Sequence, residues 1–180
     1  MRWDHLLGDL LDDLEQQADG LALAQRDAEV AELARAEFAQ LELATRLHGS
    51  LGRRLMLDIG GLGALDGVLS RVGSGWCLLD TGPREWLLRT GAVRSLRGLA
   101  ERGLVPQVLP VTARLGMGSA LRSLAGARVE VVLHRVDGVV TRGHLERVGA
   151  DFLELRAGDA AAGYLETVPF DALAAVCTWS

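Results

Sequence analysis

The sequence predicts an α+β protein in which an N-terminal α-helical arm precedes two tandem five-stranded small β-barrels. Three observations predict it: an acidic Ala-, Glu- and Leu-rich start, a sixteen-residue block that occurs twice, and short apolar stretches separated by glycine-rich turns. The boundaries that follow are a helical arm over 1–48, a first barrel over 49–98, a linker over 99–118, and a second barrel with a short leading helix over 119–180.

The composition limits the class of protein. With 180 residues, of which 49% are hydrophobic, the chain can bury a core, which excludes disorder over most of its length. No apolar run reaches the roughly 18 residues that cross a bilayer, and acids interrupt the N-terminus where a signal peptide is apolar. Cys77 and Cys177 form neither a disulfide framework nor a zinc motif. We therefore expect a cytoplasmic protein with no membrane contact.

Charge is distributed unevenly along the chain. The formal net charge is −5, yet residues 1–48 hold 11 acids against 4 arginines. All 19 basic residues are arginine, whose planar fork suits phosphate, although a coding bias toward GC-rich codons gives the same replacement. The chain as a whole lacks the basic surface of a typical nucleic-acid binder.

The first 48 residues have the pattern of helices. Residues 21–47 contain no proline or glycine and favour helix, with Gly49 in the usual stop position. Two interpretations remain open: this helix packs on its own barrel, or it pairs with a second chain as a short coiled coil. Before it, one apolar helix face is formed by Trp3, Leu6, Leu7, Leu10, Leu11 and Leu14.

The repeated block indicates a duplicated unit. GVLSRVGSGWCLLDTG (67–82) aligns without a gap with GHLERVGADFLELRAG (143–158), with seven identities. Glycine occurs inside both second strands, where a small barrel needs a bend. The flanks extend the match, with 52–59 aligned to 126–133 and 85–96 aligned to 165–176.

Each unit is predicted to contain five short strands, which bury a core only by curling into a barrel. Trp76 and Phe152 match in the alignment, and we expect both in the core, opposite Leu69 and Leu145 on the second strand. The strands of the first unit are expected at 53–59, 65–72, 76–80, 86–89 and 93–97, and those of the second at 127–133, 139–148, 152–156, 165–169 and 173–178.

A helix followed by five strands, the second carrying G-x-L, resembles the Sm-like fold of the Sm, LSm and Hfq proteins. LLRTGAV (87–93) is similar to the arginine-glycine turn of the second Sm motif. The resemblance covers residues 30–98 and 119–179, and it implies RNA binding and association of barrels through the edges of their fourth and fifth strands. The family's uridine-holding Asp and Asn are replaced by Gly73 and Cys77, and by Gly149 and Leu153, so the uridine chemistry does not carry over.

Residues 112–126, TARLGMGSALRSLAG, are similar to the helix-turn-helix of Fis-type transcription regulators. Pro110 shortens the first helix of such a motif, and the second helix has a single basic residue, Arg122, where DNA binding needs several polar contacts. The favoured interpretation is a short helix over 119–125 that caps the second barrel.

The sequence contains no catalytic or metal-binding pattern, so we expect neither an enzyme nor a cofactor. His134 and His144 flank a hairpin, but two imidazoles without a third ligand do not make a metal site. The Gly60–Gly63 stretch lacks the lysine of a phosphate loop.

Three classes of function remain open. The first is an Sm-like interaction module that binds RNA, the second a homo-oligomeric scaffold that binds other proteins along strand edges, and the third a DNA-binding regulator. The candidate nucleic-acid-binding residues are Arg71, Arg89, Arg94 and Arg147. A structural alternative is that Arg71 and Arg147 only pair with carboxylates such as Asp80 or Glu154 on the adjoining strand.

Overall fold

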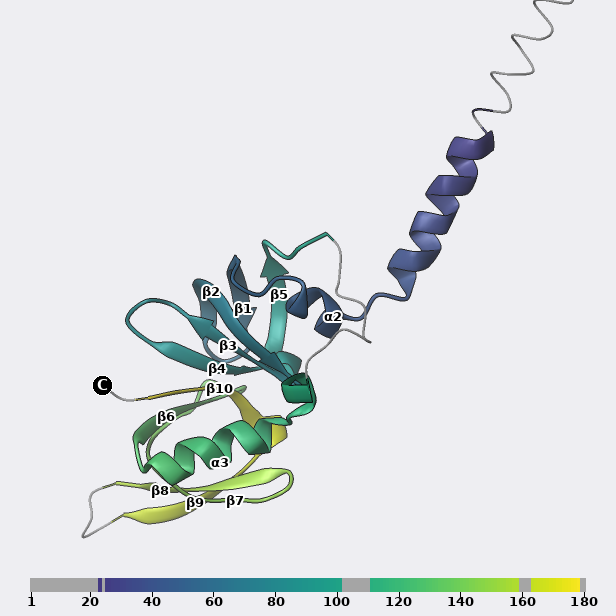
Figure 1. The fold of residues 1–180 in the computed structure, drawn as a ribbon. Helices are drawn as coiled ribbons and strands as arrows, with labels where there is room; N and C mark the ends of the chain where they lie inside the picture. Colours follow the sequence, from purple (N-terminus) through teal and green to yellow (C-terminus); the bar gives the residue numbers. More distant parts are fainter. Residues whose placement is uncertain (1–22, 24, 102–110, 159–162, 179–180) are drawn as a thin grey trace, which may run out of the picture. The chain divides into compact units, whose positions relative to one another are not determined.

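The computed structural model describes residues 23, 25–101, 111–158 and 163–178, and it confirms the α+β class (Figure 1). The chain divides into two compact units, Met1–Leu41 and Glu42–Ser180. In the first unit residues 25–39 are helical. The apolar helix face predicted over residues 3–14 lies outside the described residues.

The predicted continuous helix over 21–47 is wrong at its C-terminal end. The helix ends at residue 39, and a separate short helix, α2 (Leu43–His48), belongs to the second unit. The break occurs because Glu42 adopts an extended backbone (φ −82°, ψ 148°), which lets Leu47 enter the core of the second unit. Packing of one leucine therefore overrides the helix propensity of the stretch.

The ten predicted strands are confirmed, each within three residues at either end. The first five are β1 (Arg54–Ile59), β2 (Gly63–Gly73), β3 (Trp76–Asp80), β4 (Glu85–Arg89) and β5 (Val93–Arg97). The second five are β6 (Glu130–Arg135), β7 (Val140–Val148), β8 (Phe152–Ala157), β9 (Tyr164–Pro169) and β10 (Leu173–Thr178). A 3-10 turn precedes the fifth strand of each set, η1 (Thr90–Ala92) and η4 (Phe170–Ala172).

These strands form one open antiparallel sheet in the order β5-β1-β2-β3-β4-β10-β6-β7-β8-β9. The first five and the last five therefore have the same internal order, as a duplicated unit requires. The two separate barrels of the prediction are not confirmed, because β4 pairs with β10 of the other half and joins both halves into one sheet. Figure 1 shows the helix α3 (Met117–Ala127) beside the second half.

Glycine is required at the same place in both second strands. A Cβ on Gly67 would lie 2.4 Å from the carbonyl oxygen of Asp80, and one on Gly143 would lie 2.1 Å from that of Arg156. Both strands also shift register just before their aligned arginines, and such a bulge bends a strand. The bend predicted from the two glycines is thus present in each half.

The predicted alignment of the first strands is wrong by two residues. Leu55 lies opposite Gly67, and Val131 lies opposite Gly143, so Leu55 corresponds to Val131. The aligned ranges 52–59 and 126–133 placed Leu55 on Val129 instead. Because side chains alternate along a strand, a shift of two leaves the same faces inward, which is why the alternation alone could not detect the error.

The buried side chains form two clusters, and β10 contributes to both. Ala175 and Cys177 belong to the first cluster, whereas Val176 between them belongs to the second. The two halves therefore share a strand rather than touching as separate bodies. Fully buried leucines and isoleucine of the first cluster are Leu47, Leu55, Leu57, Ile59, Leu69, Leu79 and Leu88, and those of the second are Leu121, Leu133, Leu153, Leu155 and Leu173.

The expected position of Trp76 opposite Leu69 is also wrong. Trp76 lies opposite Gly73, and Leu69 lies opposite Leu79. Because β2 continues to Gly73, the turn between the strands is tighter than expected, and the indole packs over that glycine, 2.3 Å from where a Cβ would lie. Trp76 is buried in the second cluster, against the side of α3, rather than inside its own half.

Candidate interaction surface

Two strand edges lack a partner within the described sheet. β5 and β9 are the terminal strands of the order, so each pairs on one side only. An open edge presents unpaired N–H and C=O groups that pair readily with another chain. Apolar side chains accompany one of these edges, because Tyr164 and Leu165 on β9 are 59% and 42% exposed.

The junction between β4 and β10 shows how two such edges join in this protein. Leu88, Leu87 and Trp86 lie opposite Ala175, Val176 and Cys177. The guanidinium of Arg89 donates hydrogen bonds to the carbonyl oxygens of Leu173 (2.7 Å) and Asp171 (2.9 Å), across the same junction. The Trp86 ring also contacts that of His134, with centroids 5.3 Å apart.

Two of the four predicted nucleic-acid-binding arginines already have partners. Arg89 is held at the junction, and its side chain is only 20% exposed. Arg147 pairs with Glu154 on the adjoining strand, as the structural alternative predicted for this residue. Both partners sit within the chain, so an added phosphate would have to compete with them.

Arg71 and Arg94 differ from them. Both are exposed, and within the described residues neither guanidinium forms a hydrogen bond or ion pair. Arg71 lies opposite Leu78, which occupies the position that Glu154 holds opposite Arg147. The duplication therefore left one of two equivalent arginines without its carboxylate.

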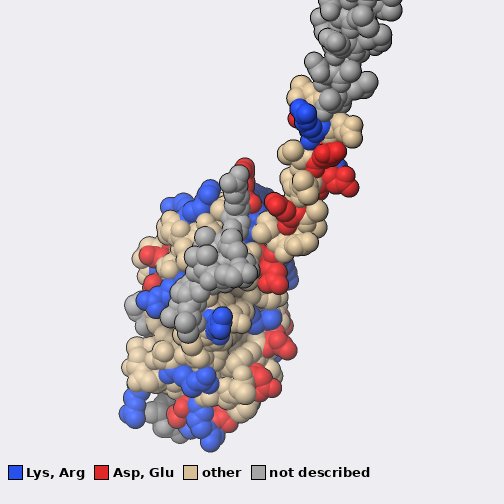
Figure 2. Space-filling view, turned by 45° about the vertical axis from the view of Figure 1, so that its right-hand side comes forward, with Lys and Arg blue, Asp and Glu red and all other residues tan. Residues whose placement is uncertain are grey.

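Other arginines of the sheet are used in cross-strand pairs. Arg54 binds Asp66 at 2.8 Å in the first half, and at the equivalent positions Glu130 binds Arg142 at 2.6 Å in the second. The charges are exchanged but the pair is kept, which indicates a role in bracing adjacent strands. The hydrogen bond from Arg142 lowers the pKa of Glu130. On the face in Figure 2, the described basic and acidic side chains are interspersed.

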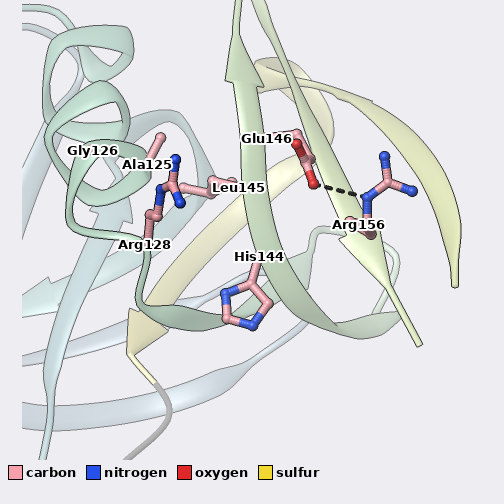
Figure 3. Close-up of a pocket in the computed structure, with 7 residues that line it drawn as sticks. All are labelled: Ala125, Gly126, Arg128, His144, Leu145, Glu146 and Arg156. Atoms are coloured by element: carbon pink, nitrogen blue, oxygen red, sulfur yellow. Dashed lines mark hydrogen bonds and ion pairs between the residues drawn. The ribbon is translucent and has the colours of Figure 1, made fainter. Parts of the chain in front are cut away.

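The sequence did not indicate a polar pocket of about 840 Å³ between the end of α3 and strands β7 and β8 (Figure 3). Arg128 enters it from the helix end, where its backbone is left-handed (φ 52°), and His144 faces it from β7. Arg156 donates to Glu146 at 2.8 Å and lowers the pKa of that carboxyl. The lining suits an anionic group better than an apolar one. Its signal in the sequence is weak, because the residues come from three separate elements.

The described residues support neither catalysis by a cysteine thiolate nor a metal site on the histidines. Burial raises the pKa of the Cys77 thiol to about 12 and also raises that of Cys177, so neither is a thiolate nucleophile near neutral pH. His134 lies opposite Val140 and His144 opposite Glu130, so the two imidazoles do not meet on the hairpin. No group of three metal-ligating side chains occurs within the described ranges.

The stretch that is similar to a helix-turn-helix contains one α-helix. Residues 111–114 form a 3-10 turn, η3 (Val111–Arg114), and α3 follows from Met117. Met117 and Leu121 of α3 are buried in the second cluster. The helix is longer than the predicted 119–125, and it packs along β7.

Acid should destabilise this fold above the range where carboxyl groups titrate. Burial lowers the pKa of His48, and burial together with the charge of Arg84 lowers that of His134. Below about pH 6.5 the two histidines therefore bind protons in the unfolded chain that they do not bind in the folded chain. As a result, the free energy of unfolding falls by up to about 1.4 kcal/mol per pH unit for each histidine.

Urea unfolding between pH 7.5 and 5 measures this slope. The variant His48→Gln should reduce it, whereas His144→Gln, which changes an exposed residue, should keep the wild-type slope. A wild-type slope in both variants would show that His48 has no part in the acid sensitivity.

No helix in the described part of the chain is long and apolar enough to cross a membrane. Comparison of the whole chain with protein-family models and with curated proteins found no match.

Proposed function

We propose that this chain is a non-enzymatic, Sm-like interaction module in which each five-stranded half of the one sheet is curled into a small barrel, and that it assembles with further copies through its free edges β5 and β9. The observation that carries the proposal is the junction between β4 and β10. There, the fourth strand of one half pairs with the fifth strand of the other. The free edges are again a fourth strand, β9, and a fifth strand, β5.

The internal junction supplies a register for the contact between copies. β4 and β9 correspond because Arg89 lies opposite Trp76 and Pro169 lies opposite Phe152. β5 and β10 correspond because each begins directly after its 3-10 turn. Transfer of the internal register places Val168, Thr167 and Glu166 of one copy opposite Ser95, Leu96 and Arg97 of the next.

The charges at this register are complementary. Arg97 is exposed and has no partner within the described residues, and it would lie opposite Glu166. One carboxylate oxygen of Glu166 meets Arg135 at 3.3 Å, while the other, Oε2, is buried and has no hydrogen-bond partner among the described residues. An arginine from a second copy would satisfy it. Asp58, which corresponds to His134, adds a second carboxylate for the two guanidinium groups.

This contact is head to tail, so each copy offers one edge of each kind. Such contacts give closed rings or open chains, and both have a mass that is a multiple of one chain. Exchange of the charges at Arg97 and Glu166, followed by measurement of that mass, tests the proposal directly. Assembly through the helix at residues 25–39 is the other route, and deletion of residues 1–41 separates the two.

Single-stranded RNA is the ligand that the resemblance implies, and the unpaired Arg71 and Arg94 favour it as a second candidate. We expect weak binding, because Arg89 and Arg147 are engaged within the chain and the net charge is −5. Each phosphate contact should give a slope of about −0.7 in a plot of log affinity against log salt concentration.

Fluorescence anisotropy with an RNA oligomer, from low to moderate salt, measures this slope. The double variant Arg71→Ala/Arg94→Ala should flatten it, and the exchange of Arg54 and Asp66 serves as a control because it keeps the ion pair. Absence of measurable affinity at low salt would remove RNA from the proposal and leave the edge contact standing.

A further inference from the structure

A groove lies beside Arg71, on the face where β3 and β4 meet α3. It has a volume of about 360 Å³, and its walls are mostly apolar. A second hollow of about 260 Å³ adjoins it, because Arg71, Trp76 and Leu115 line both. Apolar side chains of the first hollow are Trp76, Leu78, Leu87, Leu115, Ala120 and Leu124.

The groove is built by fixed contacts. The indole Nε1 of Trp76 donates to the carbonyl oxygen of Leu115 at 2.8 Å, and the backbone N–H of Ser74 donates to the same oxygen at 3.0 Å. These bonds hold the backbone of Leu115 against the first half, while its side chain stays 47% exposed. An ordered leucine is thereby presented to solvent beside a tryptophan.

Arg71 gives the groove a positive charge, and the residue opposite it on the adjoining strand is not an acid. In the second half the equivalent guanidinium, that of Arg147, is neutralised by Glu154. In the first half that carboxylate is replaced by Leu78, which itself lines the groove. At the position where the second half has the carboxylate of Glu154, the groove therefore has the apolar side chain of Leu78.

We propose that this groove binds the acidic N-terminal segment, residues 3–15, of a second copy of the chain. The inference goes beyond the edge contact and does not depend on it. The segment supplies carboxylates for Arg71 and apolar side chains for the walls of the groove. Its acids are Asp4, Asp9, Asp12, Asp13 and Glu15, and its predicted apolar helix face is formed by Trp3, Leu6, Leu7, Leu10, Leu11 and Leu14.

Length and charge fit this occupant. As a helix, residues 3–15 would be about 20 Å long. Residues 1–22 carry six acids and one arginine, while arginines at 114 and 122 neighbour lining residues in the sequence. Among the described residues that line the two hollows, Glu85 is the one acid and Arg71 the one arginine, so the electrostatic attraction of the acidic segment is directed toward Arg71. The apolar walls favour this peptide over RNA.

The test is binding of a labelled peptide of residues 2–17 to the full chain, measured by fluorescence anisotropy. Arg71→Glu should weaken binding at least about tenfold, because it places a carboxylate against the acids of the peptide. Leu78→Glu should weaken it similarly, because it gives Arg71 the internal partner that Arg147 has. A peptide with Asp12 and Asp13 changed to asparagine should also bind less tightly.

The duplication provides the matched control. Arg147→Glu makes the same charge change at the equivalent position, away from the groove, and should leave peptide affinity within about twofold of wild type. Thermal unfolding of each variant checks that it folds. If Leu78→Glu does not fold, Leu115→Ser tests the apolar wall in its place. The unlabelled peptide should displace the label.

Three results would overturn the proposal. They are absence of saturable binding up to about 1 mM peptide, equal loss in the Arg71 and Arg147 variants, and displacement of the peptide by RNA with no effect of Leu115→Ser. The last would assign Arg71 to RNA. Because the readout is peptide affinity and not mass, failure here leaves the edge contact untouched, and failure of the edge contact leaves this result intact.

Discussion

Replacement of Trp76 with alanine should lower the free energy of unfolding by about 3–5 kcal/mol. The side chain is 8% exposed and packs in the second buried cluster with Met117 and Leu121 of α3, although it belongs to the first half of the sheet. Its loss therefore opens a cavity between the halves. The hydrogen bond from Nε1 to Leu115 is lost as well, but the Leu115 oxygen keeps its bond from Ser74.

Phe152 is the matched control for this measurement. It occupies the equivalent position at the start of β8 and packs over Gly149 as Trp76 does over Gly73, but it is only half-buried. Phe152→Ala should cost about half as much, in proportion to the apolar area that it buries. Urea unfolding of the two variants gives the comparison. Equal losses would show that Trp76 does not join the halves.

Much of this fold follows from one alignment. The sixteen-residue match predicted the strands, the bend at Gly67 and Gly143, and the correspondence of Trp76 with Phe152. These features are local, since each depends on alternation, a turn residue or a close backbone approach. Arg147 and its pairing with Glu154 were predictable for the same reason, because the two residues lie close in sequence on adjoining strands.

The junction between the halves was not predictable in this way. Pairing of β4 with β10 joins strands far apart in sequence, and nothing in the alternation of Leu87 or Val176 indicates which strand lies beside it. The same limit explains Arg89, whose resemblance to an arginine-glycine turn suggested a nucleic-acid contact. Its guanidinium is held instead by two carbonyl oxygens of the other half.

The edge contact predicts a large change in mass from a single charge. Arg97→Glu would place a carboxylate opposite Glu166 of the next copy, and Glu166→Arg would place a guanidinium opposite Arg97. Like charges directly opposite on paired strands are destabilising. Each single variant should therefore dissociate at concentrations where the wild type is assembled.

A mixture of the two single variants should assemble again. The carboxylate introduced at position 97 of one variant would then meet the guanidinium introduced at position 166 of the other, and the unchanged Arg97 and Glu166 would meet at the next junction. The double variant Arg97→Glu/Glu166→Arg should likewise regain assembly. Because Glu166→Arg also removes one of the two carboxylates that pair with Arg135, the other being that of Asp137, recovery of mass in the double variant separates loss of the junction from loss of folding.

Light scattering of the full chain over a range of concentrations tests this account most directly. We expect a wild-type mass that is a whole multiple of one chain, a lower mass for Arg97→Glu, the wild-type multiple for the double variant, and persistence of assembly after deletion of residues 1–41. A wild type that stays at one-chain mass throughout, or an assembly that survives Arg97→Glu and disappears with that deletion, would contradict pairing of β5 with β9.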